Sequence, residues 1–215
     1  MKVLIADDHG IVRQGLKSLI QNSLNLEVVG EAEDGLAAVK LAKKLKPDVI
    51  IMDVTMPNLN GVEATRLIRK ESPQTKIIAL SMHPEKHIVK EILEAGASAY
   101  VLKSYLFDEL SRALDAVSDS QRYLSPRITD VVIEDYVHQT PGGGEDPATK
   151  LTSRDRQIVQ MLAEGKTIKQ IALALHISPK TADASRRKIM GKLNVSSIAD
   201  LVKYAVREGI TSLEF

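Results

Sequence analysis

Apolar runs and amphipathic stretches alternate regularly over the first half of the chain. Runs of four or five mostly aliphatic residues are typical of strands buried on both faces. They predict five strands, at 2–6, 27–31, 49–52, 76–80 and 99–102. Apolar positions at helical spacing predict a helix after each strand, at 11–21, 36–45, 62–70, 85–95 and 107–117. Five such units with short connections predict a doubly wound, five-stranded parallel sheet with helices on both faces.

The alternation of strands and helices stops after Ser118. One further helix is predicted within 122–138, because Ser125 and Pro126 have the character of an N-cap and a first helical residue. Glycine and proline then crowd residues 140–149, which predicts a flexible connection. This organisation predicts a first domain, a linker that contains the helix, and a second domain, at 1–118, 119–149 and 150–215.

The second domain has a purely helical pattern. Thr152 with Asp155, and Thr167 with Gln170, are spaced as capping boxes at the start of two helices. Four helices are predicted, which form a small bundle. The second and third of them, at 168–175 and 179–193, are joined by a short turn as in a helix-turn-helix.

Composition removes several classes of chemistry. The chain has no cysteine, which excludes disulfides, thiolate nucleophiles and cysteine-based zinc sites. No apolar stretch approaches the roughly 20 residues needed to span a bilayer, and the N-terminus lacks the pattern of a secretion signal. We therefore expect a soluble, cytoplasmic protein with no membrane partner.

The charge is distributed unevenly. The 215 residues carry a net charge of +1. Residues 151–215 hold 11 Lys and Arg against 6 Asp and Glu, a net charge of +5, which leaves −4 for residues 1–150. An acidic first part and a basic second part indicate two tasks, the second of them on a polyanion.

Carboxylates end two of the predicted strands. Asp7 and Asp8 follow the first strand, and Asp53 follows the third. The carboxyl ends of parallel strands meet at one edge of a sheet, where ligands bind. Gathered there, three carboxylates would repel one another unless a cation lies among them, and hard oxygen ligands suit Mg²⁺. The sequence therefore predicts a magnesium-binding acidic pocket.

The strand ends carry a resemblance to the receiver domains of response regulators, over about residues 1–118. Five positions match in order, namely Asp7, Asp8, Asp53, Ser81 and Lys103. The surrounding runs match as well: Ala6-Asp7-Asp8-His9, Met52-Asp53-Val54-Thr55-Met56-Pro57, Asn60-Gly61 and Tyr100-Val101-Leu102-Lys103. The resemblance implies a flavodoxin-like fold and a phosphorylation site, since a carboxylate can accept a phosphoryl group as a nucleophile.

The resemblance also implies a role for each matched residue. Asp53 would be the phosphoacceptor, with Lys103 and Ser81 contacting the phosphoryl oxygens and Tyr100 as the switch residue that follows. The Mg²⁺ ligands it implies are Asp7, Asp8, Asp53 and the backbone carbonyl of Thr55. One position departs from the family, because Ser104 follows the lysine where many receivers have proline.

The second domain resembles the LuxR-type helix-turn-helix. Three runs carry this resemblance, at 151–155, 163–172 and 175–181, and Lys192-Leu193-Asn194-Val195 adds a fourth. The start of the helix at 179–193 would enter the major groove, and basic residues would contact phosphates. The DNA-binding candidates are Lys166, Lys169, Lys180, Thr181, Asp183, Ala184, Ser185, Arg186, Arg187, Lys188 and Lys192.

The predicted recognition helix departs from the family at three positions, Ala182, Asp183 and Ser185. Ala182 removes packing volume where valine is usual, and Ser185 has a shorter reach than the usual histidine. Asp183 would either accept a hydrogen bond from a cytosine amino group or repel phosphate. We expect an unusual sequence preference or a weaker intrinsic affinity for DNA.

Together the two resemblances give the layout of NarL/FixJ-type response regulators. They imply a transcriptional regulator that is controlled by a partner histidine kinase. When phosphorylated, this regulator would bind promoter half-sites as a homodimer. The last predicted helix, at 198–207, would either pair two copies or pack internally. The alternatives are an enzyme that works through an aspartyl phosphate, and a constitutive DNA-binding protein. No cap inserted after a strand supports the enzyme, and the intact acidic pocket argues against the constitutive protein.

Overall fold

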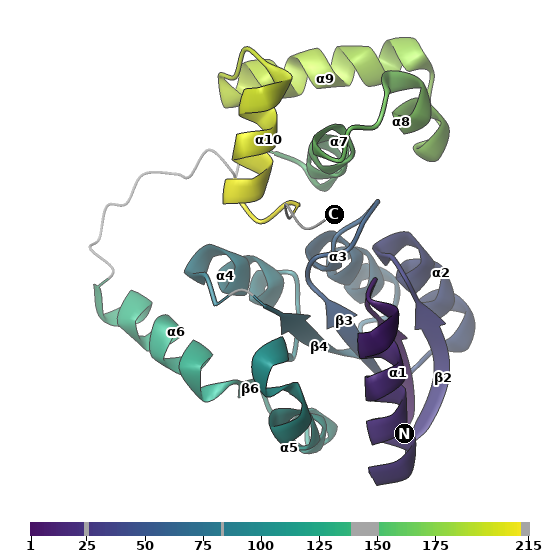
Figure 1. The fold of residues 1–215 in the computed structure, drawn as a ribbon, viewed down its shortest axis with the longest axis vertical. Helices are drawn as coiled ribbons and strands as arrows, with labels where there is room; N and C mark the ends of the chain where they lie inside the picture. Colours follow the sequence, from purple (N-terminus) through teal and green to yellow (C-terminus); the bar gives the residue numbers. More distant parts are fainter. Residues whose placement is uncertain (24–25, 83, 139–150, 212–215) are drawn as a thin grey trace. The chain divides into compact units, whose positions relative to one another are not determined.

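The computed structural model describes residues 1–23, 26–82, 84–138 and 151–211. The chain divides into two compact units, residues 1–139 and 140–215, and each is described by itself (Figure 1). The flexible connection predicted at 140–149 lies outside the described residues. Within the described ranges, no helix has both the length and the apolar character that crossing a bilayer requires.

The first unit is built on a six-stranded, all-parallel sheet with the order β2-β1-β3-β4-β5-β6. The strands are β1 Lys2–Ala6, β2 Glu27–Ala32, β3 Val49–Asp53, β4 Lys76–Ser81, β5 Ala99–Leu102 and β6 Tyr123–Leu124. The doubly wound parallel sheet is confirmed, but the expected number of five strands was wrong. β6 has only two residues, so it leaves no apolar run, and backbone pairing to Ser98 and Tyr100 defines it.

Helices cover both faces of the sheet (Figure 1). They are α1 Gly10–Ser18, α2 Gly35–Leu45, α3 Gly61–Glu71, α4 Lys86–Glu94, α5 Leu106–Ser118 and α6 Pro126–His138. A π-helical turn, η1 Leu19–Ser23, extends α1, and a 3₁₀ turn, η2 Lys103–Tyr105, precedes α5. One core lies beneath α1 and α5, and the other beneath α2, α3 and α4. Every residue of β3 is buried, which explains why such a strand is apolar at consecutive positions rather than at alternate ones.

β6 and α6 extend the sheet beyond β5. Tyr100 is the register partner of Leu124. The Ser125 hydroxyl accepts a hydrogen bond from the backbone N–H of Leu102 at 3.2 Å and donates one to the Glu109 carboxylate on α5. Ile128 of α6 is fully buried in the same core as Tyr100. β6 and α6, which lie within the predicted linker at 119–149, therefore pack on the first unit.

The second unit holds four described helices, α7 Ser153–Ala163, α8 Ile168–Ala174, α9 Pro179–Leu193 and α10 Ile198–Arg207. Capping boxes at Thr152 and Thr167 open α7 and α8 as predicted. α8 and α9 form the helix-turn-helix, and His176 in the turn takes a left-handed φ of 53°. Leu201 and Ala205 of α10 are buried in the core of their own unit, as the internal-packing alternative requires.

Candidate functional site

The carboxyl ends of three strands bring two acids and one base together. Asp7 follows β1, Asp53 ends β3, and Lys103 follows β5. Both aspartates are fully buried. Lys103 Nζ lies 2.7 Å from Asp53 Oδ2 and 2.8 Å from Asp7 Oδ2, so a single ammonium bridges both carboxylates. The parallel topology thus produces the acidic pocket that the sequence predicts.

Burial dominates the electrostatics of Asp53. It raises the pKa of the carboxyl to about 7, although Lys103 lowers it in part and the nearby Asp7 raises it again. The group is therefore poised between its neutral and ionised forms near neutral pH. Two buried carboxylates with Asp8 beside them hold more negative charge than Lys103 balances, which suits a further cation.

His9 joins this pocket, and the sequence reasoning had not made it a candidate. Its Nδ1 lies 2.8 Å from Asp8 Oδ1 and 3.3 Å from Asp7 Oδ1. One ligand atom from each of Asp7, Asp8, His9 and Asp53 falls within 4.8 Å of the others. The signal was its place directly after the acidic pair. Because most of these donors are carboxylate oxygens, the set fits Mg²⁺.

Hydrogen bonds and a close backbone approach hold the loop after β3 beside Asp53. The backbone N–H of Thr55 donates to Asp53 Oδ1 at 3.2 Å, which places Thr55 at the pocket. Asn58 takes a left-handed φ of 67° and donates to Asp34 Oδ2 at the start of α2. A Cβ at Gly61 would collide with the carbonyl of Asp53, so glycine is required there.

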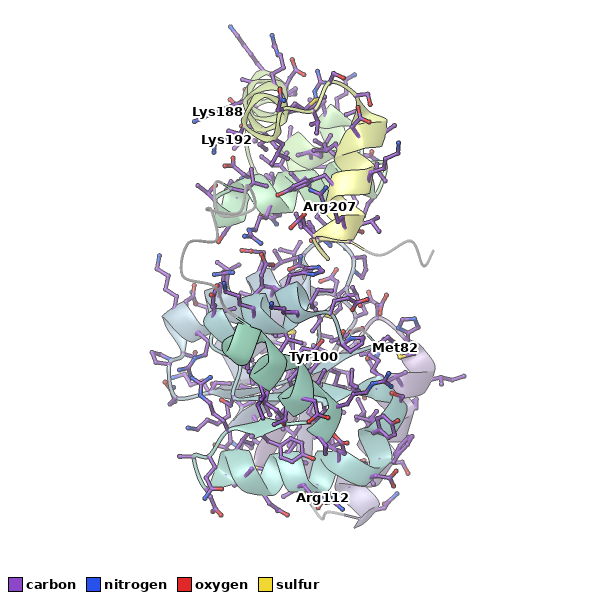
Figure 2. All side chains as sticks on the ribbon, turned by 90° about the vertical axis from the view of Figure 1, so that its left-hand side faces the viewer. Met82, Tyr100, Arg112, Lys188, Lys192 and Arg207 are labelled. Atoms are coloured by element: carbon purple, nitrogen blue, oxygen red, sulfur yellow. The ribbon has the colours of Figure 1, made fainter. Side chains whose placement is uncertain are left out.

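Ser81 and Tyr100 link the strand ends to the interior of the first unit. Ser81 ends β4 and Tyr100 lies within the adjacent strand β5, and both are fully buried. Their side chains hydrogen-bond to each other, and burial raises the pKa of Tyr100. Figure 2 shows Tyr100 within the interior of the first unit. Tyr100 therefore contacts Ser81 through its side chain and belongs to the core beneath α2, α3 and α4, which also includes Ile128 of α6.

The candidate DNA contacts of the second unit gather mainly on α9. Ala182 and Ile189 are buried, so they fix which side of the helix faces the core. Lys188 and Lys192 are labelled on this helix in Figure 2. The candidates with exposed side chains are Lys169, Lys180, Thr181, Ala184, Arg187 and Lys188. The half-buried candidates are Lys166, Asp183, Ser185, Arg186 and Lys192.

Several of these candidates are paired within the unit. Lys192 Nζ lies 2.6 Å from Asp155 Oδ2, which ties α9 to the capping box of α7. Lys166 Nζ lies 3.7 Å from a carboxylate oxygen of Glu164. Asp183 binds two arginines of its own helix, a contact that the sequence reasoning did not anticipate. The candidate DNA contacts thus fall into two groups. Exposed residues such as Lys188 are accessible to DNA, whereas residues such as Lys192 already have an intramolecular partner.

Comparison with known protein families finds a match for each of the two units. Residues 3–115 match the response regulator receiver domain family, and residues 149–205 match the LuxR family of bacterial regulatory proteins. The chain is 35% identical over 211 residues to the response regulator GacA of Pseudomonas aeruginosa, with 98% of this chain and 97% of that protein covered. It is 33% identical over 214 residues to the response regulator UvrY of Escherichia coli, with 100% and 97% covered.

Solved structures of RcsB resemble the chain over most of its length. One is RcsB of Salmonella enterica serovar Typhimurium bound to promoter rprA with the phosphomimetic BeF₃⁻. It has a TM-score of 0.63 and 28% identity and covers 95% of this chain and 97% of that chain. Another, of two RcsB dimers bound to two parallel DNAs, has a TM-score of 0.59 and 27% identity and covers 95% and 96%.

Proposed function

The chain belongs to the two-component response regulators that join a receiver domain to a LuxR-type DNA-binding domain, and we propose that phosphorylation of Asp53 switches its binding to DNA. The resemblance seen in the sequence is thereby confirmed. The proposal extends it to a cycle in which a histidine kinase donates the phosphoryl group. The division into a receiver at 1–118, a linker at 119–149 and a DNA-binding domain at 150–215 is part of the proposal, with β6 and α6 of the linker packed on the receiver. The roles of the site residues are part of the proposal as well.

The observation that carries the proposal is the buried Asp53 carboxylate, bridged to Asp7 by Lys103. An ionised Asp53 oxygen attacks the phosphorus of a phosphohistidine whose second ring nitrogen is protonated; the P–O bond forms as the P–N bond breaks, and the ring leaves as neutral imidazole. Lys103 lowers the pKa of Asp53 and so favours its ionised form before transfer, and it can pair with the phosphoryl oxygens afterwards. Exclusion of water by the buried pocket strengthens both contacts.

Mg²⁺ fits this proposal because of the donor set. Asp7, Asp8 and Asp53, with the backbone carbonyl of Thr55, would hold the ion, which supplies positive charge for the phosphoryl oxygens. The fixed loop after β3 keeps Thr55 beside Asp53. The excess of buried negative charge supports a cation at this place.

A route from the pocket to the rest of the chain runs through Ser81 and Tyr100. A phosphoryl group on Asp53 would compete with Tyr100 for the Ser81 hydroxyl. Tyr100 pairs with Leu124 of β6 and shares a core with Ile128 of α6. A change at Ser81 would therefore reach the segment that leads to the second unit, which supports a phosphorylation-dependent release or dimerisation.

We propose double-stranded promoter DNA as the partner of the second unit. α9 is the second helix of the helix-turn-helix and carries exposed basic side chains, as a recognition helix in the major groove requires. The RcsB structures with DNA support the same use of this fold, and the RcsB dimers support a homodimer that reads two half-sites. Both family matches are to regulatory domains, so we propose a transcriptional regulator in the cytoplasm and no catalysis on an external substrate.

One experiment tests the switch. Wild type and Asp53→Ala are incubated with Mg²⁺ and a small phosphodonor, and intact mass and fluorescence anisotropy on promoter DNA are read in parallel. We expect wild type to gain one phosphoryl group and to bind DNA more tightly, whereas Asp53→Ala does neither. A gain in mass with unchanged DNA affinity would refute the switch. DNA binding without any phosphoryl transfer would favour the constitutive alternative.

A further inference from the structure

Asp183 holds two arginines on the exposed part of α9. Its Oδ1 accepts hydrogen bonds from Arg186 Nε at 3.1 Å and Nη2 at 2.8 Å. Its Oδ2 accepts one from Arg187 Nη2 at 2.6 Å. The three residues are spaced i, i+3 and i+4, so they lie on one side of the helix. Both oxygens of a single carboxylate are therefore occupied by guanidinium groups.

These arginines are the α9 residues best suited to bind phosphate. A guanidinium offers a fork of N–H donors that fits a carboxylate and a phosphate equally well. Arg187 is 69% exposed, so it is accessible to a DNA backbone. In the free chain, however, Asp183 takes up the donors that a phosphate would use. The hydrogen bond from Arg186 also lowers the pKa of Asp183, so the carboxylate stays charged.

Transfer of the arginines to DNA leaves Asp183 without its partners. In the sequence of α9 it is the only acidic residue, and it would then face a groove flanked by phosphates. A carboxylate that loses its donors and much of its water is costly. A cytosine amino group in the major groove can supply the missing donor. The free-energy cost of the unpaired carboxylate is then removed at DNA sites with cytosine at that position and remains at other sites. Asp183 would thereby discriminate between DNA sequences.

We propose that Asp183 is a specificity-determining residue: it holds Arg186 and Arg187 back from phosphates in general and favours sites that present a cytosine amino group to its carboxylate. This inference rests on the proposed binding of α9 to DNA. The contact between Lys192 and Asp155 is of another kind, because it joins two helices. The sequence left two alternatives open for Asp183, a hydrogen bond from a cytosine amino group and repulsion of phosphate. The inference gives Asp183 both effects.

The test uses the full chain, treated with phosphodonor and Mg²⁺, and the variant Asp183→Asn. Glu208→Gln is the matched control, because Glu208 also pairs with an arginine, Arg207 at 2.8 Å, but lies at the end of α10. α10 packs chiefly against α7 rather than α9. Both variants change the net charge by the same amount, so a difference between them reports the position of the acid. Circular dichroism checks that each variant folds.

Two measurements are made on each protein. Anisotropy on a random-sequence duplex over a range of salt gives the non-specific affinity, and selection from a random pool gives the preferred site. We expect Asp183→Asn to bind the random duplex about tenfold more tightly at low salt, with a steeper salt dependence by about one to two phosphate contacts. We expect wild type and Glu208→Gln to select a cytosine at one fixed half-site position, and Asp183→Asn to lose it.

The outcomes separate this inference from the proposed function. Unchanged random-duplex affinity in Asp183→Asn, or the same selected site for all three proteins, overturns the role of Asp183 alone. An equal gain for Glu208→Gln also overturns it, because net charge would then be the cause. Failure of wild type to bind or select any duplex overturns the proposed function, and this inference with it.

Discussion

Lys103 and Asp53 form a buried ion pair, with 2.7 Å between Nζ and Oδ2, although fifty positions separate them in the chain. Replacement of Lys103 by methionine would leave Asp53 and Asp7 buried without their shared counter-charge. We expect Lys103→Met to lower the free energy of unfolding by about 3 kcal/mol at pH 8 in chelator. Urea denaturation followed by circular dichroism measures this loss.

The control for this prediction is an exposed pair. Lys43 Nζ lies 3.2 Å from Glu71 Oε2, with side chains that are 73% and 50% exposed. Lys43→Met should change the free energy of unfolding by less than about 0.5 kcal/mol, because water screens exposed ion pairs. Equal losses for the two variants would show that burial does not set the strength of the Lys103 contact.

Asp53 should make the stability of the first unit depend on pH. Its pKa is raised from 3.8 to about 7 in the folded chain, so between these values the folded state binds more protons than the unfolded state. The free energy of unfolding then falls as pH rises through this window and is constant above it. Asp53→Asn removes this term while Lys103 keeps Asp7 as a partner.

We expect Asp53→Asn to be more stable than wild type at pH 8 by on the order of 3 kcal/mol, and nearly equal to it at pH 4. Urea denaturation in chelator, repeated at several pH values, measures both curves. An Asp53→Asn variant that is less stable than wild type at pH 8 would contradict the raised pKa.

Mg²⁺ should stabilise the first unit by binding to the folded state alone. We expect the thermal midpoint of wild type to rise with Mg²⁺ concentration. Asp8→Asn removes one of the pocket carboxylates and should suppress most of this rise. Asp119→Asn, an exposed acid at the end of α5, should keep it. Similar rises in all three proteins would mean that the ion binds elsewhere.

Ser125 should hold β6 and α6 in place. Its fully buried hydroxyl joins the backbone of Leu102 to the carboxylate of Glu109. We expect Ser125→Ala to lower the free energy of unfolding by about 2 kcal/mol, because a buried carboxylate loses its donor. Hydrogen exchange should also speed up at Leu102 and along α6. Ser118→Ala, on the surface of α5, is the control, and equal exchange in both variants would refute this link.

Lys188 and Lys192 should differ in their effect on DNA binding, although only four positions separate them on α9. Lys188 is exposed, whereas Lys192 pairs with Asp155. We expect Lys188→Gln to weaken binding and to reduce the salt dependence by about one phosphate contact. Lys192→Gln should leave the salt dependence unchanged and lower the thermal midpoint of the second unit. The reverse pattern would make Lys192 the DNA contact.

Most of the fold of the first unit could be predicted from the sequence, because its strands are buried on both faces. Such strands appear as uninterrupted aliphatic runs, and the charged residues that end or follow β1, β3 and β5 mark the ligand-binding edge. Asp7, Asp53 and Lys103 could therefore be placed together before any coordinates. β6 could not be predicted, because two residues of strand leave no periodic signal and depend on the open edge of β5.

The second unit shows a different limit. Its helix ends were readable from local capping patterns such as Thr152 with Asp155, since these involve neighbours in the chain. The contact of Asp183 with Arg186 and Arg187 was not predicted, although its i, i+3 and i+4 spacing places the three residues on one helix face. The contact of Lys192 with Asp155 could not be predicted, because it joins residues 37 positions apart whose meeting depends on helix packing.

The pairing of β6 with β5 has a practical meaning for anyone who wishes to isolate the first unit. A fragment cut at residue 118 would strip β5 of its neighbour, expose a row of unpaired backbone groups, and uncover the core that Ile128 closes. Open sheet edges invite pairing with other chains. A fragment that ends after α6 keeps its own edge strand and is the better choice for a soluble receiver.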